Sequence, residues 1–148
     1  MLISALTEKS PLWEELIAYA GSCSWRAGRE LAEAMRENRF QDWERVFAAV
    51  ENGRIAGYCT LAKRDCIPDV PYTPYIGFVF VGEPYRGKRL SRQLIGTAME
   101  DARRLGFKEV YLVSDHRGLY EKYGFVRVDE RPAPWNPETM ETIFMHRL

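Results

Sequence analysis

The segment from residue 85 to residue 92 carries the side chains best suited to chemistry in this sequence. It reads YRGKRLSR, and four of its residues are basic: Arg86, Lys88, Arg89 and Arg92. It lies between the apolar run 76–81, which is typical of a buried strand, and a helical pattern that begins near Leu90. Free N–H groups at a helix N-terminus, and the positive end of the helix dipole, attract anions. We therefore expect this segment to bind a pyrophosphate group.

Two kinds of phosphate-binding loop are compatible with this position. Residues 82–89 have the Walker A spacing of two glycines and a lysine. However, Arg89 stands where a P-loop has the Ser or Thr hydroxyl that holds Mg²⁺, and Pro84 removes one amide donor. Both residues disfavour a P-loop nucleotide-binding protein, which we keep as the less favoured alternative.

The composition predicts one globular domain over residues 1–148. The chain is 46% hydrophobic and 28% charged, close to the averages of ~45–50% and ~25% for soluble domains. A chain of this length can bury a sizeable core without disulfide or metal staples. We find no internal repeat and no interdomain linker.

Charge and cysteine content exclude several kinds of partner. The 21 basic residues equal the 21 acidic ones, so we expect no nucleic-acid partner. No apolar stretch approaches the ~18 residues of a membrane span, and no signal-peptide pattern is present, so we expect a cytoplasmic protein without membrane contact. The three cysteines lack CxxC spacing and the chain has 2 histidines, so we expect no metal site.

Apolar periodicity predicts a mixed α/β domain in which two helices, at 12–20 and 25–38, precede any strand. Strands are expected at 43–50, 55–63, 76–81, 109–114, 125–128 and 142–147, and further helices at 90–105 and 115–123. The proline-rich segment 131–139 is expected to be a loop. Because a helix connects them, strands 76–81 and 109–114 should be parallel neighbours with a ligand at their carboxyl ends.

Two motifs resemble the GNAT superfamily of acyl-CoA-dependent N-acetyltransferases. Residues 86–91, RGKRLS, are similar to its Gln/Arg-x-x-Gly-x-Gly/Ala signature, and LYEKYGF at 119–125 is similar to its Tyr-x-x-x-Gly-Phe segment. The order of the expected elements extends the resemblance over nearly the whole chain. It implies an α/β fold with one GNAT-like domain, a mixed and mostly antiparallel sheet, a central splayed parallel strand pair and flanking helices.

Two residues depart from the family pattern. Ser91 replaces a second Gly or Ala and is small enough to preserve close packing of the helix on the ligand. Arg89 stands where the family usually has glycine. We expect Arg89 to have a helical backbone with a negative φ and a side chain that points away from the pyrophosphate.

The resemblance also implies acetyl-CoA as cosubstrate and a set of residues that bind it. Strand residues would pair with the pantetheine arm: Val79, Phe80 and Val81. Loop and helix residues would surround the pyrophosphate: Arg86, Gly87, Lys88, Arg89, Leu90, Ser91 and Arg92. Gly77 could mark a β-bulge that separates the two strands, or could equally serve close packing.

The implied reaction is direct transfer of an acetyl group to a primary amine of a small molecule or peptide. In the family, Tyr120 corresponds to the group that donates a proton to the departing CoA sulfur; core packing is the alternative role. Glu83 and Asp115, at the carboxyl ends of the two strands, are candidate bases, although Glu83 could offset the basic loop and Asp115 could cap a helix. The alternative function is a non-catalytic CoA-binding sensor or interaction module. A homodimer stays open.

Overall fold

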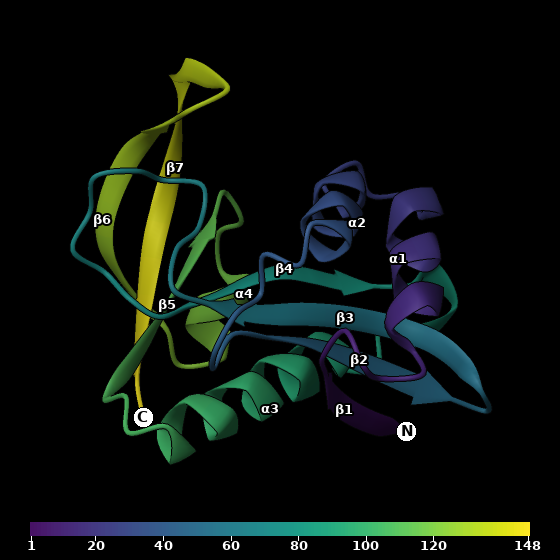
Figure 1. Ribbon diagram of the computed structural model, residues 1–148. Coiled ribbons are helices and arrows are strands. Elements are labelled where there is room, and N and C mark those ends of the chain that lie inside the picture. Colours follow the sequence, from purple (N-terminus) through teal and green to yellow (C-terminus); the bar gives the residue numbers. More distant parts are fainter.

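A seven-stranded sheet forms the middle layer of the computed structural model, which describes residues 1–148 (Figure 1). Its strands are β1 (Leu2–Leu6), β2 (Arg45–Glu51), β3 (Arg54–Ala62), β4 (Tyr75–Val81), β5 (Glu109–Ser114), β6 (Val126–Ala133) and β7 (Asn136–Arg147). They lie in the order β1-β2-β3-β4-β5-β7-β6. Only β4 and β5 are parallel; every other neighbouring pair is antiparallel.

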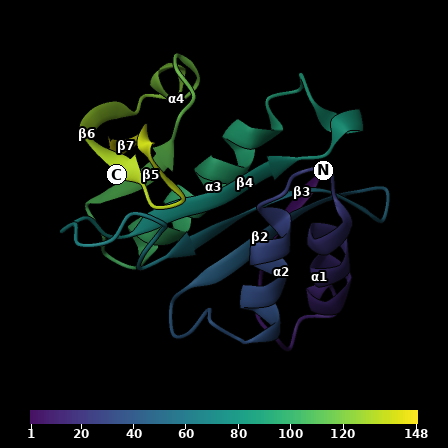
Figure 2. The ribbon, with the colours of Figure 1, turned by 90° about the horizontal axis from the view of Figure 1, so that it is seen from above.

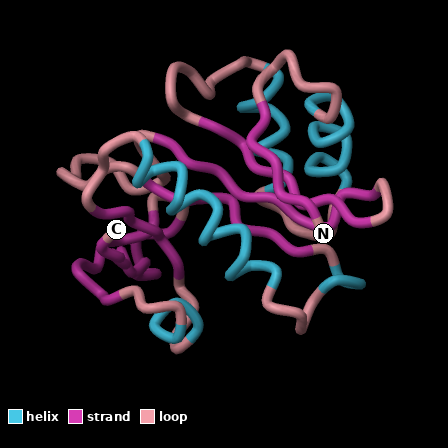
Figure 3. The backbone as a smooth tube through the Cα atoms, turned by 90° about the horizontal axis from the view of Figure 1, so that it is seen from below, coloured by secondary structure: helices cyan, strands magenta, loops and turns pink.

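Helices cover both faces of this sheet. They are α1 (Trp13–Ser22), α2 (Gly28–Arg36), α3 (Leu90–Arg104) and α4 (Leu119–Lys122), with a 3-10 turn, η1, at Glu83–Tyr85. Figure 1 shows α1 and α2 on one face, and Figure 3 shows α3 crossing the other. None of the helices is both long and apolar enough to cross a membrane. The expected α/β architecture is therefore confirmed.

Alternating side chains on the strands explain the two layers. On β2, Val46 and Ala48 pack with α1 and α2, whereas Phe47 and Ala49 pack with α3. This is the period of two that a sheet buried on both faces requires. Each helix supplies the matching stripe; on α3 it contains Leu94, which is fully buried.

The parallel pair separates almost at once. Tyr75 opposite Tyr111 is the only pair in the β4–β5 ladder, and the Tyr111 amide also donates to the carbonyl of Pro74 at 2.9 Å. Beyond this point β4 pairs only with β3, and Figure 2 shows β4 and β5 running apart. The expected splay is confirmed.

A β-bulge lies in β4 on the open side of this junction. Tyr58 of β3 pairs with Phe80, and Thr60 pairs with Gly77, so Phe78 and Val79 together oppose one residue of β3. Phe78 has a φ of 47°, a left-handed conformation that strengthens the local twist. The bulge thus follows Gly77, which itself stays in the ladder.

Three expectations about the chain ends and hairpins are wrong. β1 precedes both helices; it is a short, largely exposed edge strand whose only partner is β2. The segment 131–139 is not a loop, because β6 and β7 extend through it and turn near Trp135, which is 63% exposed. β1 is only five residues long and these segments have no alternation of apolar and polar residues, so their partner strands determine them. The helix expected at 115–123 is confined to α4.

The core around α3 should be sensitive to truncation. Leu94→Ala would leave a cavity between α3 and the sheet, so we expect it to lower the free energy of unfolding by about 2–5 kcal/mol. Denaturant unfolding would measure this loss. Gln93→Ala, on the exposed side of the same turn, is the control and should change stability little. Equal losses from both variants would contradict this packing.

Candidate functional site

The loop before α3 presents a run of amides without acceptors. Gly87, Lys88 and Arg89 donate no backbone hydrogen bond. Leu90, Ser91 and Arg92 are the first three residues of α3, whose N–H groups have no acceptor within the helix. The first amide to find one is that of Gln93, which donates to the Arg89 carbonyl at 3.2 Å. Six consecutive N–H groups are therefore available for an anion.

Positive φ values at Gly87 and Arg89 create this arrangement. Gly87 has a φ of 79° and Arg89 a φ of 61°. The expectation that Arg89 has a negative φ is wrong: the chain must turn sharply from η1 into α3, and Arg89 is the left-handed residue at the helix start. Left-handed residues next to right-handed ones turn successive amides toward one point, which is an anion-binding geometry.

The side chains around these amides add positive charge. Arg86, Lys88, Arg89 and Arg92 are all exposed, and no acidic residue forms an ion pair with any of them. The guanidinium of Arg86 is held by the end of β4: Nε donates to the Val81 carbonyl at 3.0 Å, and Cζ lies 5.7 Å from the centre of the Phe80 ring. The amides and the unpaired cations both favour a ligand with several negative charges.

The edge of β4 leads from this loop into the splayed gap. Phe80 and Val81 pair with β3 on one side and Val79 lies in the bulge, but none of the three has a partner strand on the other side. Phe80 is anchored by aromatic rings, since Trp25 stacks on it at 5.8 Å and Tyr58 at 5.3 Å. A free strand edge can pair with an extended ligand that carries amide groups. The pantetheine arm of CoA has two such amides, so the edge and the loop together fit that molecule.

Tyr120 lies on α4, the short helix that follows β5 along the chain. It is 7% exposed and packs among Tyr123, Phe125 and Phe144. Burial, and secondarily the neighbouring Tyr123, raises the pKa of the Tyr120 hydroxyl to about 12. The phenol therefore holds its proton throughout the neutral range, and a group that must donate a proton needs this property.

Asp115 lies near Tyr120, and Glu83 lies in the turn that follows β4. Asp115 follows β5 directly and is exposed, and its charge contributes to the raised pKa of Tyr120. Asp115 does not cap α4, because Gly118 occupies that position and its amide donates to the Glu121 carboxylate at 3.0 Å. Glu83 lies in the exposed η1 turn beside the basic loop.

A hydrogen bond joins α4 to the start of α3. The hydroxyls of Ser91 and Tyr123 lie 2.8 Å apart, and the Arg92 guanidinium lies 5.9 Å from the centre of the Tyr123 ring. Tyr123 also packs against the core that contains α3. Its contact with Ser91 fixes the helix that carries Tyr120 relative to the anion-binding loop.

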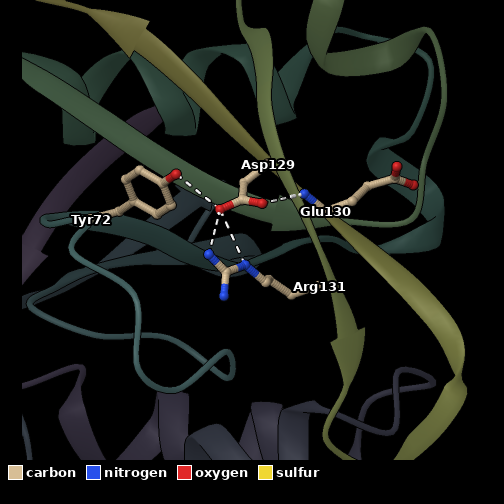
Figure 4. Close-up of polar contacts among 4 residues, drawn as sticks. All are labelled: Tyr72, Asp129, Glu130 and Arg131. Atoms are coloured by element: carbon tan, nitrogen blue, oxygen red, sulfur yellow. Dashed lines mark hydrogen bonds and ion pairs between the residues drawn. The ribbon is translucent and has the colours of Figure 1, made fainter.

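The long loop between β3 and β4 packs against β4, β5 and β7. Figure 4 shows its anchor: the Tyr72 hydroxyl donates to Asp129 at 2.9 Å, and Arg131 contacts the same carboxylate. The Arg131 and Tyr72 hydrogen bonds lower the pKa of Asp129. The loop therefore reaches from β3 across to β6 and brings Asp65 over β4.

Sequence reasoning missed two acidic residues on this side, Asp65 and Glu141. Glu141 lies on β7, between the segment 131–139 that was expected to be a loop and the strand expected at 142–147, and it is 7% exposed. A carboxylate beside the apolar strand 142–147 was the available signal, but only the pairing of β7 shows where it points. No group of three or more His, Cys, Asp or Glu residues is placed to hold a metal ion.

The comparisons with known proteins agree with this geometry. The model of the acetyltransferase (GNAT) family matches residues 12–125. No curated protein is similar enough in sequence to count as a relative.

Solved structures share the fold at low sequence identity. The aminoglycoside 6'-N-acetyltransferase from Enterococcus faecium has a TM-score of 0.75 at 18% identity, over 99% of this chain and 97% of that one. The ribosomal-protein-alanine N-acetyltransferase from Brucella melitensis has a TM-score of 0.72 at 18% identity, over 100% of both chains. A GNAT family acetyltransferase from Elizabethkingia anophelis with acetyl-CoA bound has a TM-score of 0.68 at 21% identity, over 99% and 97%.

The Ser91–Tyr123 hydrogen bond can be tested with a double-mutant cycle. Ser91→Ala and Tyr123→Phe should each lower the free energy of unfolding by about 1 kcal/mol, because each removes the same half-buried bond. Once one hydroxyl is gone, removing the other should cost little more. Denaturant unfolding of the four proteins measures the coupling. Strictly additive losses would show that the two hydroxyls do not stabilise each other.

Proposed function

Because this chain belongs to the GNAT acetyltransferase family, we propose that it transfers an acetyl group from acetyl-CoA directly to a primary amine of a small molecule or peptide. The observation that carries this proposal is the run of six free amides from Gly87 to Arg92, which lies next to the unpaired edge of β4. One part suits a pyrophosphate and the other suits an extended amide chain.

The residues that would hold acetyl-CoA follow from that arrangement. Val79, Phe80 and Val81 would pair with the pantetheine arm. Around the pyrophosphate would lie Arg86, Gly87, Lys88, Arg89, Leu90, Ser91 and Arg92. Bound in this way, acetyl-CoA supplies an activated thioester at the splayed gap. The pyrophosphate would meet the basic side chains without competition from a protein carboxylate, since none of them is in an ion pair.

In the proposed reaction, side chains of the protein transfer the protons. The amine must lose a proton as its nitrogen bonds to the acetyl carbon, and the sulfur must gain one as the C–S bond breaks. Tyr120 is the proposed donor to sulfur, because burial keeps its hydroxyl protonated. Asp115 is the better-placed candidate base, since its charge reaches the Tyr120 hydroxyl. Glu83 is the second candidate base, in the exposed η1 turn beside the basic loop.

Two of the three thiols, those of Cys59 and Cys66, offer no route through an acetylated enzyme, and the third, Cys23, contacts the Ala20 carbonyl and the Tyr58 hydroxyl rather than a histidine. Cys59 is fully buried, and burial raises the pKa of its thiol well above the usual range. Cys66 is exposed, but burial of its sulfur and the charge of Asp65 raise its pKa too. Neither supplies the reactive thiolate that a covalent intermediate needs. Direct attack by the amine is therefore the proposed route.

Tyr120→Phe tests the chemistry apart from cofactor binding. We expect kcat to fall about 100-fold or more, the usual cost of losing a general acid, while acetyl-CoA affinity measured by calorimetry stays the same. Release of free thiol with a panel of primary amines measures kcat. Lys122→Ala, which is exposed on the same helix, is the control and should keep normal turnover. A protein that binds acetyl-CoA but acetylates no amine would instead be a CoA-binding module.

The pKa of Tyr120 also predicts a pH profile. The phenol is active when protonated, and burial raises its pKa to about 12 from an ordinary 10.0. Raising the pH through 10 should therefore not reduce kcat through Tyr120, and the loss should come only near pH 12. Measurement of kcat at saturating substrate across the alkaline range checks this. A decline centred on pH 10 that disappears in Tyr120→Phe would contradict it.

A further inference from the structure

Three carboxylates near the splayed gap have no cationic partner. Asp65 lies in the β3–β4 loop, Asp115 follows β5, and Glu141 lies on β7. None of the five ion pairs in the molecule includes them. Glu141 is only 7% exposed, and a buried carboxylate without a partner is costly. A positive charge from outside the protein would remove that cost.

Strand register brings Glu141 to the carboxyl end of β5. Thr142 pairs with Ser114 and Ile143 with Val113, so Glu141 lies level with Asp115, one step beyond the ladder. Because side chains alternate along a strand, Glu141 shares the face of Ile143. Ile143 packs with Tyr75 on the face opposite α3. Glu141 therefore faces the side of the gap that the β3–β4 loop covers.

Asp65 reaches the same face from above β4. One of its carboxylate oxygens lies only 2.6 Å from where a Cβ on Gly77 would be, and the other accepts the Cys66 amide at 2.6 Å. Gly77 is thus required by the approach of Asp65. This explains a glycine in the middle of the strand, which the sequence left open between a bulge and packing.

The hydroxyl of Tyr75 is a second, independent sign of a ligand. Tyr75 is 2% exposed and its hydroxyl has no hydrogen-bond partner. Burial and the neighbouring Asp65 charge raise its pKa above the usual range, so it is a neutral phenol. A buried hydroxyl without a partner loses free energy that a ligand bonding to it would restore.

The surrounding charges favour a cation. Arg131 lies opposite Glu141 in the β6–β7 ladder, but its guanidinium pairs with Asp129 and not with Glu141. Burial raises the carboxyl pKa of Glu141, and so do the negative charges of Asp115 and Asp65; only His116 acts the other way. Burial likewise raises the pKa of Asp65, and Glu30 adds to this effect. The reacting amine must be neutral when it attacks, so it cannot compensate these charges. A second ammonium group on the acceptor can.

We propose that Asp65, Tyr75 and Glu141 form a subsite for a second, non-reacting ammonium group, and that the acceptor is consequently a diamine or polyamine. This inference rests on the proposed acetyltransferase function. The two carboxylates pair with the ammonium, and the Tyr75 oxygen accepts one of its N–H groups. Asp115, at the end of β5, would act on the reacting amine and is not part of this subsite.

Two amines of equal length test the subsite. Pentane-1,5-diamine and pentylamine differ by one ammonium group, and we expect kcat/KM to be at least about tenfold higher for the diamine, mainly through KM. Both are assayed with the full-length protein by acetyl-CoA-dependent thiol release. Equal kcat/KM values in the wild-type protein would overturn the proposal.

Charge-neutral variants locate the effect. Glu141→Gln and Asp65→Asn should each reduce the diamine preference at least about fivefold and leave kcat for pentylamine nearly unchanged. Glu138→Gln, an exposed residue on the same strand as Glu141, is the matched control and should keep the preference. Retention of the full preference in both Glu141→Gln and Asp65→Asn would also overturn the proposal.

A stability measurement shows that these variants fold and that the charge is buried. A raised carboxyl pKa means that the folded protein binds the proton more tightly than the unfolded chain, so ionisation at neutral pH costs stability. Glu141→Gln should therefore melt at a higher temperature than the wild type at neutral pH, and the gain should vanish in acid. A lower melting temperature at neutral pH would contradict a buried, unpaired charge.

Failure of the two proposals can be distinguished. If no amine causes release of free thiol from acetyl-CoA, the proposed transfer is wrong. Calorimetry with the CoA-loaded protein then tests amine binding at the subsite by itself. Binding of the diamine but not of pentylamine, lost in Glu141→Gln, would support the subsite as a cation site. Equal or absent binding of both amines would overturn it.

Discussion

The separation of β4 from β5 is the constraint on which the rest of the site depends. One residue pair, Tyr75 with Tyr111, holds the two parallel strands together. Past that pair, the bulge at Phe78 and Val79 turns β4 away, and the edge of β4 that faces β5 has no partner strand. Buried backbone groups without partners are costly. A ligand that supplies the missing partners is the physical reason for such an opening.

The two ends of this opening differ in charge. At the outer end of β4, four unpaired basic side chains surround the free amides before α3. On the face beneath the β3–β4 loop, Asp65 and Glu141 are unpaired and acidic. A net charge of zero for the whole chain conceals this division. An anionic cofactor and a cationic acceptor would thus be attracted to different parts of the same gap, and each would be repelled from the other's place.

Local signals determine how much of this could be predicted from the sequence. β5 was placed at the residues it occupies and α3 nearly so, because both are strongly periodic and α3 is followed by Gly106, which has a φ of 92°. β1 and the first half of β7 were missed, because they are exposed and only their partner strands define them. The basic loop was found because its residues are contiguous. Asp65 and Glu141 were not, because they come from distant segments that only the topology brings together.

Backbone strain marks the same region independently of charge. Six residues other than glycine have a positive φ, and four of them are Asn or Asp, which tolerate it. The two exceptions are Phe78, in the bulge that opens β4, and Arg89, at the start of α3. Each costs roughly 1–3 kcal/mol, and such residues persist where the surrounding structure over-determines them. That both lie on either side of the free edge of β4 indicates that the shape of this edge is maintained at the expense of stability.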